Sequence, residues 1–426
     1  MKNSYTVSVI GMGYVGIPLS TLLALNCDVI GFDVDKDRIK SLQNSILPIN
    51  EPGLPEIFNQ AINSRKLKFT YDAREIRNTL IKIVTVGTPY LADASQIDMS
   101  QLESALKIVV PELKNGDILL LKSTVPPGTT SGFVKQMVEK EGFKVPGEIG
   151  LAFAPERMIE GQAISDFQTL PKIIGATDER TFSIVSELLS TIGGKIIRVS
   201  NPETAEMAKM VDNYSRYVFL ALTNELALIS EKIGVDVLEL IRAAKDDYPR
   251  NSGLLLPGPG VGGSCLNKDP FILQAEMTRN NLNLRMVECS REVNNYMPLH
   301  VAELVMKYAE NRKKAVLLGV SFKEDTNDTR FTPTFFIEEM LKAEQFKVKL
   351  SDPFVKGERI IVDPYAASKD ADIIVILTAH SVYRKIELET LYNLMENKPL
   401  MIDTRGLFDR DKAISLGFEY HGVGRL

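Results

Sequence analysis

The first 35 residues contain the feature that most constrains how this chain can fold. The apolar, β-branched run YTVSVI (5–10) leads into GMGYVG, in which Gly11, Gly13 and Gly16 form a G-x-G-x-x-G pattern. A helix-like segment (17–26) and a second strand-like segment (27–35) follow, and the latter carries the acidic Asp33. This order of strand, glycine turn, helix, strand and acid is typical of a dinucleotide-binding βαβ unit.

Each part of this unit has a chemical reason. The glycines permit a tight turn and close approach of a pyrophosphate, while the N-terminus of the helix supplies backbone N–H groups and a positive dipole. Asp33 can accept hydrogen bonds from the adenosine ribose hydroxyls, which favours NAD over its 2′-phosphorylated form. The candidate cofactor contacts are Gly11, Gly13, Tyr14, Val15, Gly16, Asp33, Arg38, Thr88 and Thr124.

Further strand-and-loop patterns follow at 81–89, 117–129 and 148–157. Ligands of an open parallel sheet lie beyond the carboxyl ends of its strands. Thr88, Thr124 and Glu156 are therefore expected to face one crevice.

Two more regions complete the predicted architecture. Residues 203–233 contain no Gly or Pro and keep apolar residues at helical spacing, so they predict a long helix with Lys209 and Asn213 one turn apart. A long apolar helix between domains often builds a dimer interface, which predicts a homodimer. A second α/β pattern begins near Lys313, without the full glycine fingerprint. We expect two Rossmann-like domains with parallel sheets (1–200 and 312–426) joined by a helical central domain (201–311).

Composition excludes several classes of protein. The 426 residues are 44% hydrophobic and 25% charged, and the net charge is −5. This charge provides no positive electrostatic field for non-specific binding to nucleic acid or to a membrane. The start MKNSYT runs directly into a strand-like segment, and no window is apolar enough to span a bilayer. We expect a cytoplasmic protein without nucleic-acid or membrane partners.

The three cysteines are odd in number and widely separated, which argues against a disulfide framework and a zinc site, so no metal is expected. Cys265 is exceptional because it lies in the glycine loop GPGVGGSCLNKDP (258–270). The charge of nearby Lys268 can favour its thiolate. Cys27 and Cys289 are expected to be inert, buried small hydrophobes.

The three histidines show no spacing for metal ligation or for a Cys–His pair. His380 follows a predicted strand, where contact with a ligand is one alternative, but we expect it at a helix start or on the surface. Catalysis must therefore proceed without histidine. A thiol beside a nicotinamide suggests oxidation of an aldehyde through a thiohemiacetal and a thioester, which water hydrolyses to a carboxylic acid.

Six motifs, in order and over nearly the whole chain, resemble those of the UDP-glucose/UDP-N-acetylhexosamine 6-dehydrogenase family. They are GMGYVG, STVPPGT, APERMIEG, AKMVDNYSRYVFLALTNEL, GPGVGGSCLNKDP and GVSFKEDTNDTR. The resemblance implies oxidation of the C6 alcohol of a UDP-sugar to a carboxylate, with NAD used twice per turnover.

The resemblance also implies catalytic roles. Cys265 resembles the nucleophile, and Asp269 resembles the partner that helps to activate the hydrolytic water. Lys209 and Asn213 resemble the pair that stabilises the oxyanion and positions water. Thr124 resembles a residue that positions cofactor and water. Glu156 resembles the acid of the family's PE motif, a candidate base for hydrolysis or C6 proton removal.

For the substrate, Lys323 and Arg330 resemble contacts to the uridine diphosphate. Arg405 is a weaker candidate on the cofactor-facing side, and Arg250 is a candidate that reaches the substrate across the dimer. Together the implied substrate contacts are Arg157, Glu160, Lys209, Asn213, Arg250, Gly262, Lys323 and Arg330.

The chain mixes features of two branches of the family. APER and the PGPGVGG loop resemble the N-acetylhexosamine branch, whereas IEG, GGSC and NKD resemble the UDP-glucose branch. Because Arg157 and the PGPGVGG loop surround the sugar more closely, UDP-N-acetyl-D-mannosamine is favoured, with UDP-N-acetyl-D-glucosamine and UDP-glucose as alternatives. A binding protein without turnover and a two-electron alcohol dehydrogenase are competing hypotheses. The thiol of Cys265 argues against both of these hypotheses, because neither function needs a nucleophile.

Overall fold

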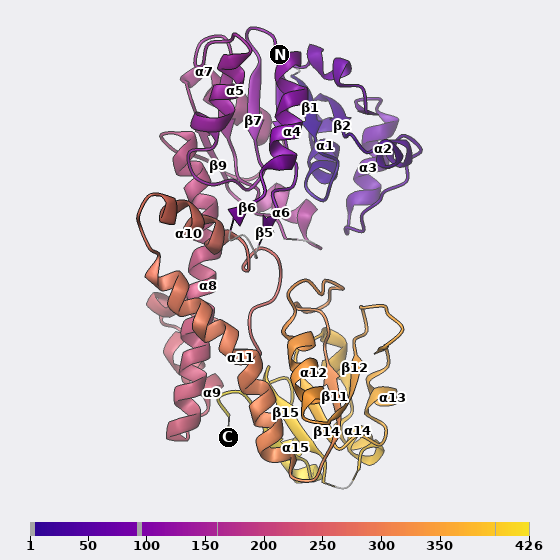
Figure 1. The fold of residues 1–426 in the computed structure, drawn as a ribbon. Coiled ribbons are helices and arrows are strands. Elements are labelled where there is room, and N and C mark those ends of the chain that lie inside the picture. The colour runs from indigo at the N-terminus through magenta and orange to yellow at the C-terminus, as the bar shows by residue number, and fades with distance from the viewer. Residues whose placement is uncertain (1–4, 92–95, 160, 397, 426) are drawn as a thin grey trace. The chain divides into compact units, whose positions relative to one another are not determined.

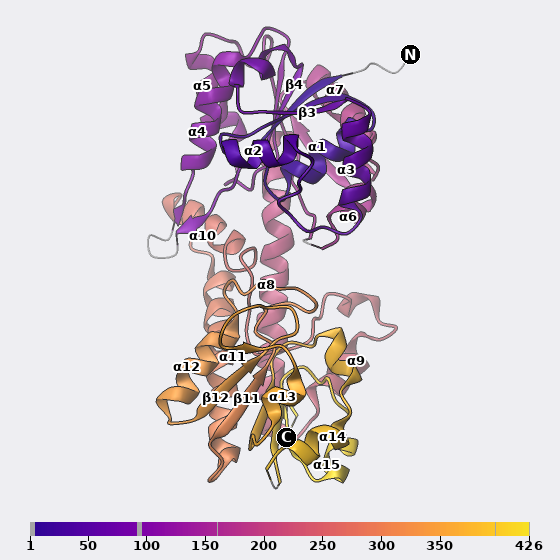
Figure 2. The same cartoon turned by 90° about the vertical axis from the view of Figure 1, so that its right-hand side faces the viewer.

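The computed structural model describes residues 5–91, 96–159, 161–396 and 398–425. It comprises two units, Met1–Asp212 and Asn213–Leu426, each with a central sheet and helices on its faces (Figures 1 and 2). The boundary between the units falls inside the long helix α8 (Pro202–Ile233). The three-domain division at 200/201 and 311/312 stays a prediction.

Unit 1 contains an eight-stranded sheet in the order β10-β9-β8-β7-β4-β1-β2-β3. Its strands are β1 (Thr6–Ile10), β2 (Asp28–Phe32), β3 (Leu67–Thr70), β4 (Ile81–Val84), β7 (Ile118–Leu121), β8 (Gly150–Phe153), β9 (Lys172–Ala176) and β10 (Ile196–Arg198). A small antiparallel pair is formed by β5 (Tyr90–Leu91) and β6 (Gln96–Ile97). The helices are α1 (Gly16–Ala24), α2 (Lys36–Gln43), α3 (Leu54–Asn63), α4 (Ser100–Val109), α5 (Lys135–Lys140), α6 (Ala163–Thr169), α7 (Glu179–Ser190) and the start of α8.

The sheet of unit 1 confirms the predicted Rossmann-like architecture, with one departure. The strands from β3 to β8 pair in parallel, but β9 pairs antiparallel with β8. Large α/β sheets often add an antiparallel segment at an edge. The predicted parallel sheet therefore includes one antiparallel pairing, at this edge.

Unit 2 contains a six-stranded parallel sheet in the order β13-β12-β11-β14-β15-β16. Its strands are β11 (Lys314–Leu318), β12 (Lys347–Ser351), β13 (Ile360–Ile361), β14 (Ile373–Ile376), β15 (Leu400–Asp403) and β16 (Glu419–His421). Its helices are the rest of α8, α9 (Val237–Lys245), α10 (Asp269–Arg279), α11 (Arg285–Ala309), α12 (Pro333–Ala343), α13 (Pro364–Ser368), α14 (Leu388–Leu394) and α15 (Arg410–Leu416).

Both sheets are buried on both faces because their strands are apolar at successive positions. In β7, Ile118 and Leu120 belong to one core cluster, and Leu119 and Leu121 belong to the other. The strand β11 divides its residues in the same way between the two clusters of unit 2. Alternation of side chains across a strand fills both layers at once and fixes the register.

The predicted long helix is confirmed, since α8 runs for 32 residues from Pro202 to Ile233. Within the described residues, no helix combines the length and the apolar character needed to cross a membrane.

Candidate active site

A cavity of about 520 Å³ opens in unit 1 where β1, β2 and β4 end. Its lining includes Gly11, Gly13, Asp33 and Arg38. Gly11 has a φ of +98°, and a Cβ on Gly16 would lie 1.9 Å from the carbonyl oxygen of Gly11, so the turn requires glycine at both positions. A Cβ on Gly13 would meet nothing within 4 Å, which leaves room on the cavity wall for a dinucleotide.

Asp33 is fixed at this cavity by its neighbours. Its Oδ2 accepts a hydrogen bond from the N–H of Met12 at 2.7 Å, and its Oδ1 accepts one from the N–H of Asp35 at 3.0 Å. The guanidinium of Arg38 lies 3.3 Å from Oδ2. The carboxylate of Asp33 is therefore held in one orientation at the cavity, and Arg38 serves partly to hold it.

Other predicted cofactor contacts lie elsewhere. Among the described residues, Tyr14, Val15 and Gly16 are not part of the cavity lining. The hydroxyl of Tyr14 donates to Glu51 at 2.6 Å, and that carboxylate also accepts from the N–H of Ala163 at 2.6 Å. Tyr14 thus joins the glycine turn to the start of α6.

Three polar residues in the lining, Ser100, Gln101 and Ser104, were not predicted from the sequence. They lie in the first turns of α4, which follows the hairpin β5–β6. The sequence feature that could have revealed them is a polar cluster at the start of an apolar helical stripe. Helices that follow parallel strands begin near the edge of the sheet where ligands bind, so polar residues there are candidate ligand contacts.

Thr88 and Thr124 meet at the ends of β4 and β7. The hydroxyl of Thr88 donates to the carbonyl oxygen of Thr124 at 2.5 Å, so the loops after these two strands are joined. This contact confines the backbone of Thr124 and leaves its partly buried side chain on the loop surface.

A buried acid that sequence reasoning missed anchors the same loop. Glu206 of α8 accepts hydrogen bonds from the N–H of Gly128 at 2.6 Å and from the N–H and hydroxyl of Thr130 at 2.8 and 2.6 Å. Burial raises the pKa of Glu206 to about 7, although these bonds lower it. The STVPPGTT loop is thereby tied to α8.

Glu156, which is partly buried after β8, forms an ion pair with the buried Lys122. Its Oε2 lies 3.2 Å from the ammonium of Lys122, and its Oε1 accepts from the N–H groups of Arg157 and Met158 at 2.9 and 3.0 Å. Burial and the charge of Lys122 lower the pKa of the neighbouring Lys172 to about 8, against the opposing effect of Glu156. The guanidinium of Arg157 donates to the carbonyl oxygen of Pro171. The predicted contact Glu160 lies outside the described residues.

The thiol loop lies in unit 2, just before α10. Cys265 is exposed, and its carbonyl oxygen accepts from the N–H of Asp269 at 2.9 Å. Asp269 is buried, and its Oδ2 accepts from Nδ2 of Asn213 at 2.6 Å, while the ammonium of Lys268 lies 3.9 Å from Oδ1. The structure therefore brings together Asn213 and Asp269 near the loop of Cys265. Lys209 is buried one helical turn before Asn213 on α8.

The two other thiols differ from each other. Cys27 is buried, and burial raises its pKa, in agreement with the inert role predicted for it. Cys289 is exposed on α11, so the expectation of a buried residue is wrong there. The helix turns this position towards solvent, which a local apolar pattern does not reveal.

The glycines of the thiol loop pack on the loop that follows β11. A Cβ on Gly262 would lie 2.3 Å from Cβ of Phe322, and one on Gly263 would lie 2.6 Å from its ring. The N–H of Gly263 donates to the carbonyl oxygen of Arg330 at 2.9 Å. The cysteine loop and the loop with Lys323 and Arg330 are thus in direct contact.

A second cavity, of about 250 Å³, opens beside this contact at the ends of β11, β14 and β15. It is lined by Phe322, Lys323, Glu324, Leu377, Thr378 and Arg405. Arg405 also approaches the thiol loop, since a Cβ on Gly258 would lie 2.4 Å from its Nη1. The exposed Arg330 is held by Asp328 in a two-pronged ion pair. Arg250 is exposed on a 3-10 turn and lies over the ring of Tyr248.

Comparison with known proteins identifies domains of one family along the chain. Sequence profiles match an NAD binding domain at residues 5–193, a central domain at 203–296 and a UDP binding domain at 316–410. The fold and these matches thus define an NAD-dependent UDP-sugar dehydrogenase as the class of protein. All three profiles carry the same family description, and the chain belongs to the UDP-glucose/GDP-mannose dehydrogenase family.

Individual relatives match over nearly the full length. The chain is 32% identical to the UDP-N-acetyl-D-mannosamine dehydrogenase of Methanocaldococcus jannaschii, with 98% of this chain and 96% of that protein covered. It is 31% identical to a UDP-glucose 6-dehydrogenase of Bacillus subtilis, with 98% and 93% covered. The solved structure of the UDP-D-ManNAc dehydrogenase of Pyrococcus horikoshii is similar with a TM-score of 0.90 and 30% identity, and 99% of each chain is covered.

Proposed function

We propose that the protein oxidises the C6 alcohol of UDP-N-acetyl-D-mannosamine to the uronic acid through a thioester on Cys265. One observation carries this proposal. The exposed thiol of Cys265 lies in a glycine loop. This loop packs directly on the loop of the UDP binding domain that follows β11 and carries Lys323 and Arg330, which we call the nucleotide-side loop. A dehydrogenase that stopped at the aldehyde would have no use for a nucleophile at this position.

The reaction removes four electrons in two steps. Bound NAD supplies the acceptor for both hydrides, the first from the C6 alcohol and the second from the carbon of the thiohemiacetal. Gly11, Gly13, Asp33 and the polar start of α4 would hold the cofactor. Between the two hydride transfers, the thiolate of Cys265 adds to the aldehyde carbon, and loss of the second hydride leaves a thioester.

Hydrolysis then frees the enzyme. Water adds to the thioester carbon, the carbon–sulfur bond breaks, and the acid leaves while the thiolate is regenerated. In balance, one alcohol, two NAD and one water give one carboxylate, two NADH and three protons.

We assign the polar groups of the site to this hydrolysis. Asp269, fixed by its hydrogen bond from Asn213 at 2.6 Å, positions the water. Lys209 supplies positive charge for the oxyanion, and Thr124 orients the cofactor side. Glu156 is a carboxylate held by Lys122 at 3.2 Å, and we assign it the role of proton acceptor.

The uridine diphosphate would be held in unit 2. Lys323 and Arg405 line the cavity of about 250 Å³, and fixed positive charge suits a pyrophosphate. Arg330 adds a guanidinium from the loop that contacts the cysteine loop. We further propose that Arg157, Gly262 and Arg250 contribute to the sugar side of the site.

The choice of sugar is supported by the similarity to the UDP-N-acetyl-D-mannosamine dehydrogenases of Methanocaldococcus jannaschii and Pyrococcus horikoshii, and by the PGPGVGG loop. UDP-glucose is the second candidate, because a UDP-glucose 6-dehydrogenase is 31% identical to this chain. The purified protein should be incubated separately with UDP-N-acetylmannosamine, UDP-N-acetylglucosamine and UDP-glucose plus excess NAD. Two NADH per sugar and the mass of a uronic acid identify the substrate. One NADH per sugar would exclude the thioester route.

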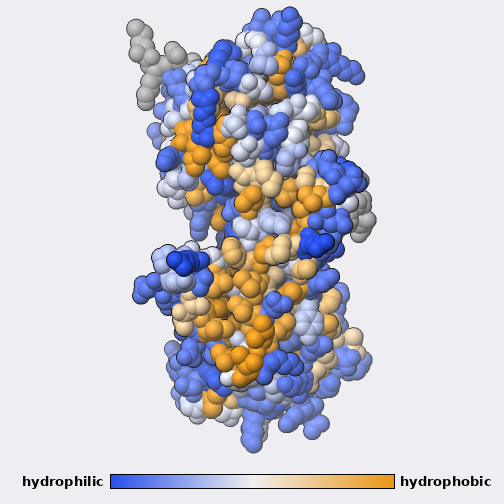
Figure 3. All heavy atoms as spheres, turned by 90° about the vertical axis from the view of Figure 1, so that its left-hand side faces the viewer, coloured by the Kyte–Doolittle hydropathy of each residue, from blue (hydrophilic) through white to orange (hydrophobic). Residues whose placement is uncertain are grey.

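We also propose a homodimer. Exposed apolar side chains on α8 include Phe219, Leu222, Ile229 and Ile233, which are 36%, 40%, 47% and 65% exposed. Their spacing of three, seven and four positions places them in one stripe of the helix, as in paired helices. Figure 3, which views the side of the molecule on which α8 lies, shows apolar side chains gathered over unit 2.

We further propose a cytoplasmic location, because a reducing cytoplasm would keep the thiol of Cys265 free.

A further inference from the structure

His380 is a buried histidine that has no part in the reaction described above. It lies after β14 and directly before the 3-10 turn η5 (Ser381–Lys385), as predicted for a helix start. Its side chain is 0% exposed, however, so the alternative expectation of a surface residue is wrong. It packs against the rings of Phe354 and Tyr383. A buried imidazole needs partners for both ring nitrogens.

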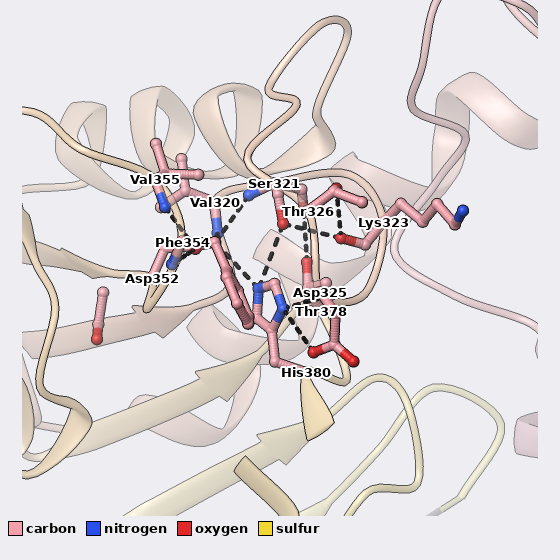
Figure 4. A network of polar contacts seen from close by, with 12 residues as sticks. Val320, Ser321, Lys323, Asp325, Thr326, Asp352, Phe354, Val355, Thr378 and His380 are labelled. Carbon is pink, nitrogen blue, oxygen red and sulfur yellow. Dashed lines mark hydrogen bonds and ion pairs between the residues drawn. The ribbon is translucent and has the colours of Figure 1, made fainter. Parts of the chain in front are cut away.

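The hydrogen bonds of His380 define its tautomer. The backbone N–H of Asp325 donates to Nδ1 at 2.9 Å, so Nδ1 is an acceptor and carries no proton. The ring proton of the neutral imidazole is therefore on Nε2, which lies 3.1 Å from Oδ2 of Asp352 and 3.2 Å from the hydroxyl of Ser321. The ring thus bridges the end of β12 and the loop after β11 (Figure 4).

Asp352 is a rigid anchor for this bridge. Its Oδ2 also accepts from the N–H groups of Val320 and Ser321 at 2.7 and 2.9 Å. Its Oδ1 accepts from the N–H groups of Phe354 and Val355 at 2.9 and 3.0 Å. Burial raises the pKa of Asp352, but the hydrogen bonds from the imidazole and the backbone outweigh it and hold the pKa at about 2.

On the other side of the ring, the network fixes the backbone of Lys323. The carbonyl oxygen of Lys323 accepts from the hydroxyls of Ser321 and Thr326, each at 3.0 Å. Asp325 has a φ of 55°, so the loop turns sharply there, and its carboxylate accepts from the N–H of Ser381 at 2.9 Å. Figure 4 shows the ammonium of Lys323 extending away from these groups. Its backbone is thus held while its side chain lines the cavity of about 250 Å³.

From this arrangement we infer that His380 is a positioning residue for nucleotide diphosphate: it holds the Ser321–Thr326 turn so that Lys323 presents its charge to the phosphates. The inference rests on the proposed function, in which Lys323 contacts the uridine diphosphate. The bond from Asp325 to Nδ1 is the decisive contact, because it joins the imidazole to the turn itself.

Two matched substitutions separate the two halves of the bridge. In His380→Asn, the side-chain oxygen can occupy the position of Nδ1 and accept from Asp325, while the contact with Asp352 is lost. In His380→Gln, the amide reaches the position of Nε2 and can donate to Asp352, while the contact with Asp325 is lost. His380→Ala removes both contacts.

The readout is binding of UDP and, separately, of NADH to the full chain, measured by calorimetry. We expect His380→Ala and His380→Gln to raise the Kd for UDP by about tenfold or more. His380→Asn should recover most of the wild-type affinity, and the Kd for NADH should stay unchanged in all three. Equal UDP affinity of His380→Ala and wild type would overturn the inference, as would rescue by Gln and not by Asn. Failure of the wild type to bind UDP would instead overturn the proposed function.

A milder pair of variants applies if the His380 variants do not fold. Ser321→Ala removes the hydroxyl that contacts both the ring and the carbonyl oxygen of Lys323, and it should weaken UDP binding several-fold. Ser351→Ala is its control, since Ser351 is equally buried and its hydroxyl has no hydrogen-bond partner among the described residues. Equal effects of the two substitutions on the Kd for UDP would contradict the positioning role.

Discussion

Substitution of Gly262 tests how closely the loop of Cys265 must approach the nucleotide-side loop that carries Lys323 and Arg330. In Gly262→Ala, the added methyl carbon would lie 2.3 Å from Cβ of Phe322 and 3.2 Å from the carbonyl oxygen of Phe331. Carbon atoms in contact are separated by about 3.5–4.0 Å, so one loop must move by more than about 1 Å. Because Cβ of Phe322 is bonded to its backbone, a rotamer change cannot relieve the clash, and the shift must reach Lys323 or Cys265.

Displacements of this size are costly for catalysis. A misplacement of about 1 Å can reduce rates on the order of 100-fold, so we expect kcat/KM for the UDP-sugar to fall by about that factor. The Kd for NADH should stay unchanged, because the cavity of about 520 Å³ is lined by residues of unit 1 alone. Initial rates of NADH formation with varied UDP-sugar, together with NADH titration, measure both quantities.

Gly132→Ala is the matched control, since an added Cβ there meets nothing within 4 Å and the backbone has no positive φ. It should retain wild-type kcat/KM and thermal stability. If Gly262→Ala keeps kcat/KM within about twofold of the wild type, the close packing of the two loops has no functional importance and the reasoning fails.

Three further predictions concern other parts of the molecule. Asp33→Ala should raise the Kd for NADH by about 10- to 100-fold, because charge-assisted hydrogen bonds contribute about 1.5–3 kcal/mol, and an unchanged value would remove Asp33 from the cofactor site. The pKa of Glu206 rises from the ordinary 4.5 to about 7, so the folded state retains a proton that the unfolded chain releases, and stability falls as pH rises through this window. Glu206→Gln cannot release this proton, so its stability should not fall in this way. Urea unfolding should show the free energy of unfolding of Glu206→Gln, relative to that of the wild type, rising by up to about 3 kcal/mol between pH 4.5 and pH 8. A difference that does not change with pH would contradict the raised pKa of Glu206. Leu222→Glu should shift the mass by light scattering from dimer to monomer, whereas Ile414→Glu, at a site of similar exposure (40% and 47%), should not.

Much of the fold could be predicted because its signals are local. The turn from Gly11 to Gly16 and the acid Asp33 lie within one βαβ unit, and the long helix is continuous in sequence, so pattern alone locates them. The antiparallel pairing of β9 could not be predicted, because strand direction at a sheet edge depends on packing of the whole layer.

The supporting contacts of the site were harder to predict for the same physical reason. Glu206 binds a loop 76 to 78 residues earlier, and His380 contacts groups 28, 55 and 59 residues away. Such contacts depend on the tertiary fold, and a single acid or imidazole in a helix or loop has no spacing that reveals them. The exposure of Cys289 likewise depends on which face of α11 packs inward.

In the proposed reaction, Cys265 carries the acyl group. The most direct measurement is a reaction of Cys265→Ala with the preferred UDP-sugar and excess NAD, with NADH per sugar and product mass recorded, and with Cys289→Ala as the control for an exposed thiol. We predict that Cys289→Ala forms two NADH and the uronic acid like the wild type, whereas Cys265→Ala forms no acid and at most one NADH per sugar. Two NADH and full acid formation by Cys265→Ala would contradict the account.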